Sequence, residues 1–179
     1  WTSAGGGAFG SDYISGIEAV NKDTAFIPYN PGGGTTTHIF RTTNGGATWN
    51  SVYVQSPGYI NVIRMIDATN GIAVGDPTGG KWTVVKTSDG GSTWARILTE
   101  PDEIGGETGS NFEGMSVVGA SHVWFTSRGG RVYRSTDAGA TWNYSAIPFS
   151  GFLPRIHFND MQYGLVGNPS GTAVLRTED

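Results

Sequence analysis

One ten-residue stretch occurs three times in this chain: RTTNGGATWN at 41–50, KTSDGGSTWA at 86–95 and RSTDAGATWN at 134–143. The tryptophans of these three boxes, Trp49, Trp94 and Trp142, are 45 and 48 residues apart, and Trp1 lies 48 residues before the first. A period of about 40–50 residues is typical of β-propeller blades. The spacing therefore predicts a single domain over 1–179, divided into four repeats of approximately 1–48, 49–93, 94–141 and 142–179.

Each repeat contains three short apolar runs before its box, such as YINVIRMI, GIAVG and TVVKT in the second repeat. The runs are rich in β-branched and aromatic residues and are bounded by Gly, Asn, Asp or Pro, a pattern that predicts strands. A fourth strand is expected to start at each box tryptophan, as in WNSVYV, WARILT and WNYSAI. Four strands per repeat form the antiparallel sheet of one blade, so the predicted fold is an all-β propeller.

The boxes resemble the Asp-box, or BNR repeat, whose pattern is Ser/Thr-x-Asp-x-Gly-x-Thr-Trp. Two departures occur: Asn44 replaces the first aspartate, and Ala138 replaces the first of two glycines in the third box. The resemblance implies that the boxes are structural and lie away from the ligand site. Their defining residues are Asn44, Gly46, Trp49, Asp89, Gly91, Trp94, Asp137, Gly139 and Trp142.

Asp-boxes occur in sialidases, xyloglucanase-type glycosidases, sortilin-like receptors and photosystem II assembly-factor propellers. The phrases NGIAVGDP and YGLVGNP make this chain most similar to the assembly-factor propellers and their bacterial relatives. Propellers with Asp-boxes usually have more than four blades, so we expect these residues to be part of a six- to eight-bladed propeller. The alternative is a closed four-bladed ring in which WTSA supplies the fourth strand beside AVLRT.

The resemblance also places the first strand of each blade along a central channel, with the boxes on one face of the propeller. Because side chains alternate along a strand, the apolar and polar residues of these first strands face opposite ways. The apolar set, expected between the sheets, is Ile17, Ile63, Met115 and Ile156. The polar set, expected on the channel, is Glu18, Arg64, Ser116 and His157, joined by Arg155 two positions before His157.

The channel residues Glu18, Arg64, Arg155 and His157 predict a binding site for an anionic or polyhydroxyl ligand through charge-assisted hydrogen bonds. The alternative is a water-filled channel like that of any propeller, lined by polar side chains that already have hydrogen-bond partners and bind no ligand. Tyr13, Tyr59 and Phe152 precede the first strands and are expected at the channel entrance on the face opposite the boxes. There they would either offer flat platforms for a sugar or protein, or fill gaps between blades.

The insertion LTEPDEIGGETGSNFEG at 98–114 is the one acidic stretch of the chain. Its carboxylates are Glu100, Asp102, Glu103, Glu107 and Glu113. Clustered carboxylates can bind calcium or serve as the acid and base of a glycosidase. However, their spacing fits no calcium loop, so a solvated loop is the expected structure.

Composition excludes several classes of function. The net charge of -4 provides no polybasic surface for nucleic acid. No apolar run approaches the roughly 20 residues needed to cross a bilayer. Cysteine is absent, and the three histidines lie in different repeats, so neither a metal site nor a cofactor is expected.

These observations favour a non-catalytic propeller that binds protein or glycan as a scaffold or assembly module, through its channel rim and the face opposite the boxes. Charged residues make up only 15% of the chain, which with abundant Thr, Gly and Asn suits a secreted, periplasmic or cell-surface protein of bacterial type. The alternative is a fragment of a glycoside hydrolase, such as a sialidase or xyloglucanase. A sialidase needs three substrate-binding arginines, whereas only Arg64 and Arg155 are expected in the channel, so binding is favoured over catalysis.

Overall fold

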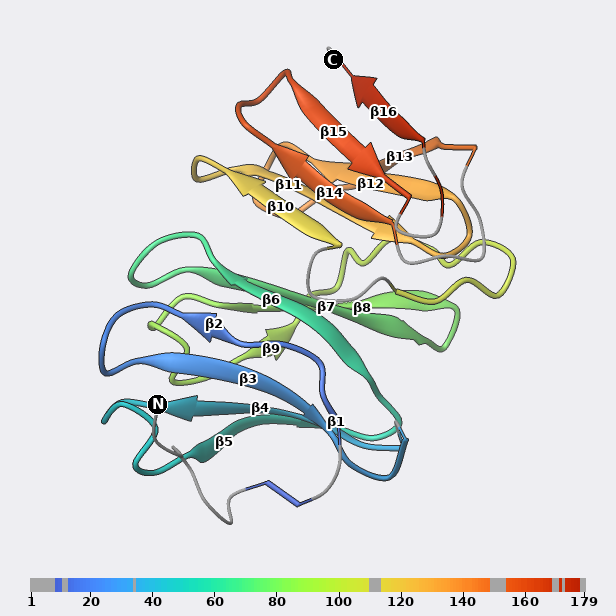
Figure 1. The fold of residues 1–179 in the computed structure, drawn as a ribbon. Helices are drawn as coiled ribbons and strands as arrows, with labels where there is room; N and C mark the ends of the chain where they lie inside the picture. The colour runs from blue at the N-terminus through green and yellow to red at the C-terminus, as the bar shows by residue number, and fades with distance from the viewer. Residues whose placement is uncertain are drawn as a thin grey trace.

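The computed structural model describes residues 9–10, 13–33, 35–109, 114–148, 154–168, 171 and 173–177. These residues form four antiparallel sheets, which stack face to face in chain order (Figure 1). The only helical turn in the described part of the chain is the 3-10 turn η1 (Pro31–Gly33). The predicted all-β architecture of antiparallel propeller sheets is confirmed.

The sheets are named blades 1 to 4, and their strands are given from the inner edge outward. Blade 1 contains β1 (Tyr13–Ile14), β2 (Glu18–Ala19), β3 (Ala25–Asn30), β4 (Thr37–Thr42) and β5 (Asn50–Gln55). Blade 2 contains β6 (Ile60–Met65), β7 (Gly71–Thr78), β8 (Lys81–Thr87) and β9 (Ala95–Arg96). Blade 3 contains β10 (Met115–Val118), β11 (His122–Ser127), β12 (Arg131–Ser135) and β13 (Asn143–Ala146). Blade 4 contains β14 (Arg155–Phe158), β15 (Gly164–Gly167) and β16 (Val174–Thr177).

The inner position of blade 1 is divided between two short strands, because β1 and β2 both pair with β3. The run YISGIEAV, predicted to be one strand, is interrupted at Ser15–Ile17. Ile17 lies in this interruption and is 52% exposed, so its predicted place between the sheets is wrong. The equivalent residues Ile63, Met115 and Ile156 are buried, as the alternation of side chains predicts.

The three boxes close the turns between the third and fourth strands with the same hydrogen bonds. In the second box, the Thr87 hydroxyl donates to Asp89 and accepts from the Gly91 amide, while Asp89 accepts from the Thr93 amide. Each box also donates one backbone amide to the turn between the first two strands of its own blade, as Gly90 does to the Thr69 carbonyl at 2.8 Å. The boxes and these turns therefore lie at the same end of the stack.

In the described part of the chain, the buried apolar residues form three clusters, each shared by two neighbouring blades. Phe26 and Ile39 of blade 1 pack with Ile63 of blade 2, and the box residue Trp94 meets the Phe26 ring edge-on at 5.9 Å. Trp82 of blade 2 packs against Phe125 of blade 3 at 5.0 Å. Trp124 of blade 3 stacks on Phe158 of blade 4 at 3.8 Å. Burial of apolar surface between sheets therefore holds the stack together.

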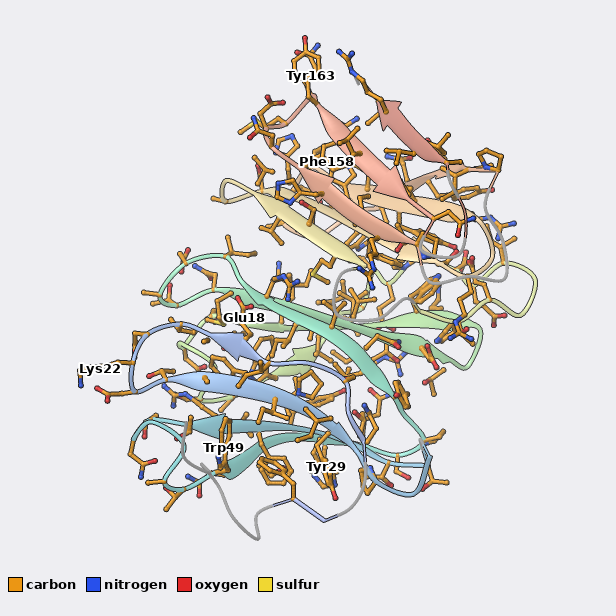
Figure 2. The ribbon with its side chains drawn as sticks, viewed as in Figure 1. Glu18, Lys22, Tyr29, Trp49, Phe158 and Tyr163 are labelled. Carbon is orange, nitrogen blue, oxygen red and sulfur yellow. The ribbon has the colours of Figure 1, made fainter. Side chains whose placement is uncertain are left out.

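Blades 1 and 4 lie at opposite ends of the stack, so the described residues form an open arc and not the closed four-bladed ring considered as the alternative (Figure 1). The outer face of blade 4 carries the apolar side chains of Leu165, 51% exposed, and Val174, 64% exposed. Tyr163 extends from the same blade at the end of the arc (Figure 2). No helix among the described residues has the length and apolarity needed to span a bilayer.

Candidate functional site

A hollow of about 730 Å³ opens along the inner strands β6, β10 and β14. Arg64, Ser116, Arg155 and His157 all line it, so the structure brings together four of the five polar residues predicted to face the channel. Apolar side chains also contribute, among them Leu165 of blade 4. None of the described residues that line the hollow is acidic, so its lining carries the positive charge of two arginines.

Strand alternation produces this arrangement in blade 4. Along β14, Ile156 and Phe158 are buried against blade 3, while Arg155 and His157 are exposed on the other face. Leu165 is the cross-strand partner of His157 in the β14–β15 pair. The site therefore combines cationic and polar groups with an adjacent apolar surface.

Glu18, the fifth predicted channel residue, does not line the hollow but forms an ion pair with Arg64, which does. Its Oε2 atom lies 3.6 Å from Nη1 of Arg64, and its Oε1 atom accepts a hydrogen bond from the Met65 amide at 3.0 Å. Glu18 extends from β2 in blade 1, next to the inner strand of blade 2 (Figure 2). Arg64 also donates from Nη1 to the Ile63 carbonyl at 2.9 Å. These contacts hold the Arg64 side chain between the two blades.

Of the three aromatic residues predicted at the channel entrance, the structure describes the side chain of one, Tyr59. Tyr59 is half-buried and lines a different hollow, of about 440 Å³, together with Asp76 and Pro77. Tyr13 pairs through its backbone with Asn30, but its side chain lies outside the described part of the structure. Phe152 also lies outside the described residues. The entrance platform therefore stays a prediction.

The acidic insertion is not the solvated loop that was predicted, because two of its carboxylates are buried. Glu107 accepts hydrogen bonds from Ser127 at 2.5 Å, from Arg131 at 3.1 Å and from the Tyr133 hydroxyl. Glu100 accepts from the Val84 amide at 2.9 Å and from Nε of Arg96 at 2.6 Å. A buried carboxylate needs such partners, and here they fix the insertion to blades 2 and 3.

The insertion also takes the place of most of an outer strand in blade 2. β9 has only two residues, and beyond it Trp82 donates its amide to the Pro101 carbonyl at 2.9 Å. Burial raises the pKa of Tyr133, and its hydrogen bond to Glu107 raises it further. Tyr133 therefore keeps its proton and remains a hydrogen-bond donor to the Glu107 carboxylate.

Sequence reasoning missed a set of side chains that join consecutive blades. Asn30 accepts from the Ile60 amide at 3.1 Å, Asp76 accepts from the Gly109 amide at 2.7 Å, and Thr126 donates to the Pro154 carbonyl at 2.7 Å. Asn30 and Asp76 each precede a proline in the sequence. Their placement at the end of the second strand in successive repeats was the available signal.

The described residues contain no group of three His, Asp or Glu side chains that could bind a metal ion. The polar side chains that line the hollow are those of arginine, histidine and serine. Such groups donate hydrogen bonds to carboxylates or to other acceptor-rich ligands.

Comparison with protein families gives a match over residues 14–165 to the family described as Photosynthesis system II assembly factor YCF48. The chain belongs to this family. The family match confirms the resemblance to assembly-factor propellers that was inferred from the boxes. A comparison with curated protein sequences finds no significant match.

Solved structures with a similar fold include YCF48 bound to D1 peptide, with a TM-score of 0.60 and 19% identity. The alignment covers 93% of this chain and 54% of the YCF48 chain, so the chain spans about half the length of that relative. The GH74 enzyme of Niastella koreensis is also similar, with a TM-score of 0.59, 19% identity and coverage of 89% and 26% of the two chains. An ancestral GH74 enzyme has a TM-score of 0.55 and 16% identity, over 92% and 25% of the two chains. At these identities the structural matches establish the propeller fold.

Proposed function

We propose that this chain is part of a protein-binding assembly propeller, and that it holds an acidic segment of a partner protein in its channel. The observation that carries the proposal is the convergence of Arg64, Arg155 and His157 on one hollow with no acidic lining among its described residues. Two guanidinium groups provide charge-assisted hydrogen bonds to carboxylates. Leu165 and Val174 also line this hollow, from the outer face of blade 4.

The comparisons support this proposal through one relative. The YCF48 structure was solved with a D1 peptide, so a propeller of this family binds a peptide of another protein. For the present chain, the expected ligand class follows from the charge of its own channel. An acidic peptide fits that charge better than a neutral glycan does.

The proposal is tested by replacing both arginines in the variant R64A/R155A. A peptide array of graded net charge is bound to the wild-type chain and to the variant at physiological salt. We expect the wild type to retain acidic peptides, and the variant to bind them at least about tenfold more weakly, since a charge-assisted hydrogen bond contributes roughly 1.5–3 kcal/mol. Equal retention by both proteins would reject the channel as the binding site.

The alternative function is a fragment of a glycoside hydrolase, and the GH74 structures share the propeller fold with this chain. The arrangement of the described carboxylates favours binding, because Glu100 and Glu107 are engaged in fixing the insertion. Glu113 lies outside the described residues. Hydrolysis of a fluorogenic β-glucoside, abolished in E18Q or E113Q, would support the hydrolase and contradict the binding proposal.

We also propose that the protein is secreted, periplasmic or at the cell surface. This location is supported by the low fraction of charged residues, 15%, and by the abundance of Thr, Gly and Asn. Fractionation of the native host with an antibody to this chain tests it. Recovery of the protein with cytoplasmic markers would contradict this part of the proposal.

A further inference from the structure

Two junctions between inner strands are closed by the same hydrogen bond. Ser116 Oγ of blade 3 accepts from the Phe158 amide of blade 4 at 2.9 Å. Glu18 Oε1 of blade 1 accepts from the Met65 amide of blade 2 at 3.0 Å. Glu18 and Ser116 occupy equivalent positions in their repeats, as do Met65 and Phe158. At these two junctions a single oxygen atom accepts the amide of the next blade, and a serine hydroxyl is sufficient for this.

Glu18 differs from Ser116 because it brings a second oxygen and a negative charge to the junction. The second oxygen lies 3.6 Å from Nη1 of Arg64, and the side chains of Glu18 and Arg64 are only 19% and 21% exposed. Arg64 lines the channel hollow, whereas Glu18 is not among its lining residues. The Glu18 carboxylate therefore affects the charge of the channel through its ion pair with Arg64.

We propose that Glu18 determines how tightly the channel binds anions, by holding the Arg64 guanidinium at the junction and opposing the approach of a ligand carboxylate. This inference rests on the proposed function and deepens it. An acidic segment must compete with Glu18 for Arg64, so only a ligand with several carboxylates, or with added apolar contact, binds well. Glu18 is thus a selectivity residue that does not itself touch the ligand.

The variant E18Q separates the charge of Glu18 from its structural role. The glutamine side chain keeps an oxygen that can accept from the Met65 amide, but it removes the charge beside Arg64. One unit charge several ångströms from the ligand changes affinity by roughly 3- to 10-fold at the screening expected near a protein surface. The matched control is T126V, which removes a hydrogen bond between blades 3 and 4 at a residue that does not line the hollow, and changes no charge.

The experiment measures binding of fluorescein-labelled hexaglutamate by fluorescence anisotropy, with hexaglutamine as the neutral control. We expect E18Q to bind hexaglutamate about 3- to 10-fold more tightly than the wild type, with a larger difference at low salt. T126V should bind it with unchanged affinity, and hexaglutamine should not discriminate between the proteins. Equal affinity of E18Q and wild type, together with weaker binding by R64A/R155A, would overturn the role of Glu18 and leave the proposed function standing.

A second measurement does not depend on ligand binding. Phenylglyoxal modification of Arg64, followed by peptide mass spectrometry, reports how far the carboxylate shields the guanidinium, with Arg155 as the internal reference. We expect Arg64 to react several-fold faster in E18Q, and equal rates would overturn the inference. Absence of hexaglutamate binding by every protein would instead reject the proposed function, and the labelling rates would still decide whether Glu18 holds Arg64.

Discussion

Asn44, Asp89 and Asp137 occupy one position of the box turn, where either an amide or a carboxylate is accommodated. All three accept a hydrogen bond from the backbone amide four residues later, at 2.8–3.0 Å. The carboxylates of Asp89 and Asp137 also accept from the threonine hydroxyl at that position, whereas Asn44 donates to the hydroxyl of Thr48. The threonine hydroxyl can donate or accept, so it adapts to either side chain.

The carboxylates make the turn sensitive to acid. Hydrogen bonds from the Thr93 backbone and hydroxyl lower the pKa of Asp89 to about 2, and those from the Thr141 hydroxyl and backbone lower the pKa of Asp137 to about 2. These folded-state pKa values lie below the ordinary value of 3.8. The two ionised carboxylates therefore stabilise the folded protein fully above about pH 4, and this stabilisation is lost as the pH falls toward 2. We expect D137N to unfold at a lower temperature than wild type at pH 7, and the difference to vanish near pH 2. Thermal unfolding at several pH values measures both.

The converse substitution is the control. N44D introduces a carboxylate into the first box, so its unfolding temperature should fall more steeply than that of the wild type between pH 4 and pH 2. A D137N variant whose difference from wild type stays constant over this range would contradict the assigned role of the Asp137 carboxylate.

Gly91 is required for two separable reasons. Its φ of +75° lies in the left-handed region, and a Cβ at this position would overlap the ring of Phe26 in blade 1. Gly79 has a similar φ of +69°, but a Cβ there would meet nothing within 4 Å. We expect G79A to destabilise the protein by about 1 kcal/mol through backbone strain alone, and G91A by roughly 2–4 kcal/mol because the added methyl group also displaces the Phe26 ring. Equal effects in urea unfolding would show that the contact between blades contributes nothing.

At the scale of elements, buried carboxylates fix the insertion at 98–109 to blades 2 and 3. The Glu107 side chain is fully buried, whereas Asp102 pairs with Lys81 at 2.5 Å while 78% exposed. Removing one partner of a buried charged cluster typically costs about 3–5 kcal/mol, and breaking an exposed pair costs at most about 1 kcal/mol. We therefore expect E107A to lower the free energy of unfolding by about 3–5 kcal/mol, and the control D102A by less than about 1 kcal/mol.

Hydrogen exchange identifies where the E107A variant is weakened. Faster exchange should appear first at 104–109, because the Ile104 amide donates to Glu107 and the Arg128 amide donates to the Thr108 carbonyl. A variant that is destabilised without this local change would show that Glu107 does not anchor the insertion.

At this scale, the strands could be predicted from the sequence, but the burial of the insertion could not. Strand positions could be predicted because the same apolar runs recur with each box, and the alternation in β14 correctly separated Arg155 and His157 from Ile156. The interruption of the first run in blade 1 follows from Gly16, which is a weak strand former, and from Ser15, whose hydroxyl donates to the Ile60 carbonyl of the next blade. The burial of Glu107 could not be predicted, because its partners Ser127 and Tyr133 lie 20 and 26 residues away in another blade.

At the scale of the whole molecule, the blades form an array in which the buried contacts of the described residues join each blade to the next one in the chain. Every core cluster spans two consecutive blades, and the junction hydrogen bonds of Glu18, Ser116, Asn30, Asp76 and Thr126 do the same. The stability of such an array is approximately a sum of terms for each unit and each interface. A change at one end of the arc should therefore leave the other end unaffected.

Two phenylalanines at opposite ends of the arc test this independence. Phe158 stacks on Trp124 at the junction of blades 3 and 4, and Phe26 packs against Trp94 at the junction of blades 1 and 2. Replacing either buried ring by alanine costs about 3–5 kcal/mol. Native-state hydrogen exchange should then show F158A losing protection in β14–β16 while β3–β5 keep theirs, and F26A should show the reverse. Equal loss of protection in every blade of both variants would mean that the four blades unfold as one cooperative unit, because coupling through the shared cores would then exceed the cost of opening a terminal blade.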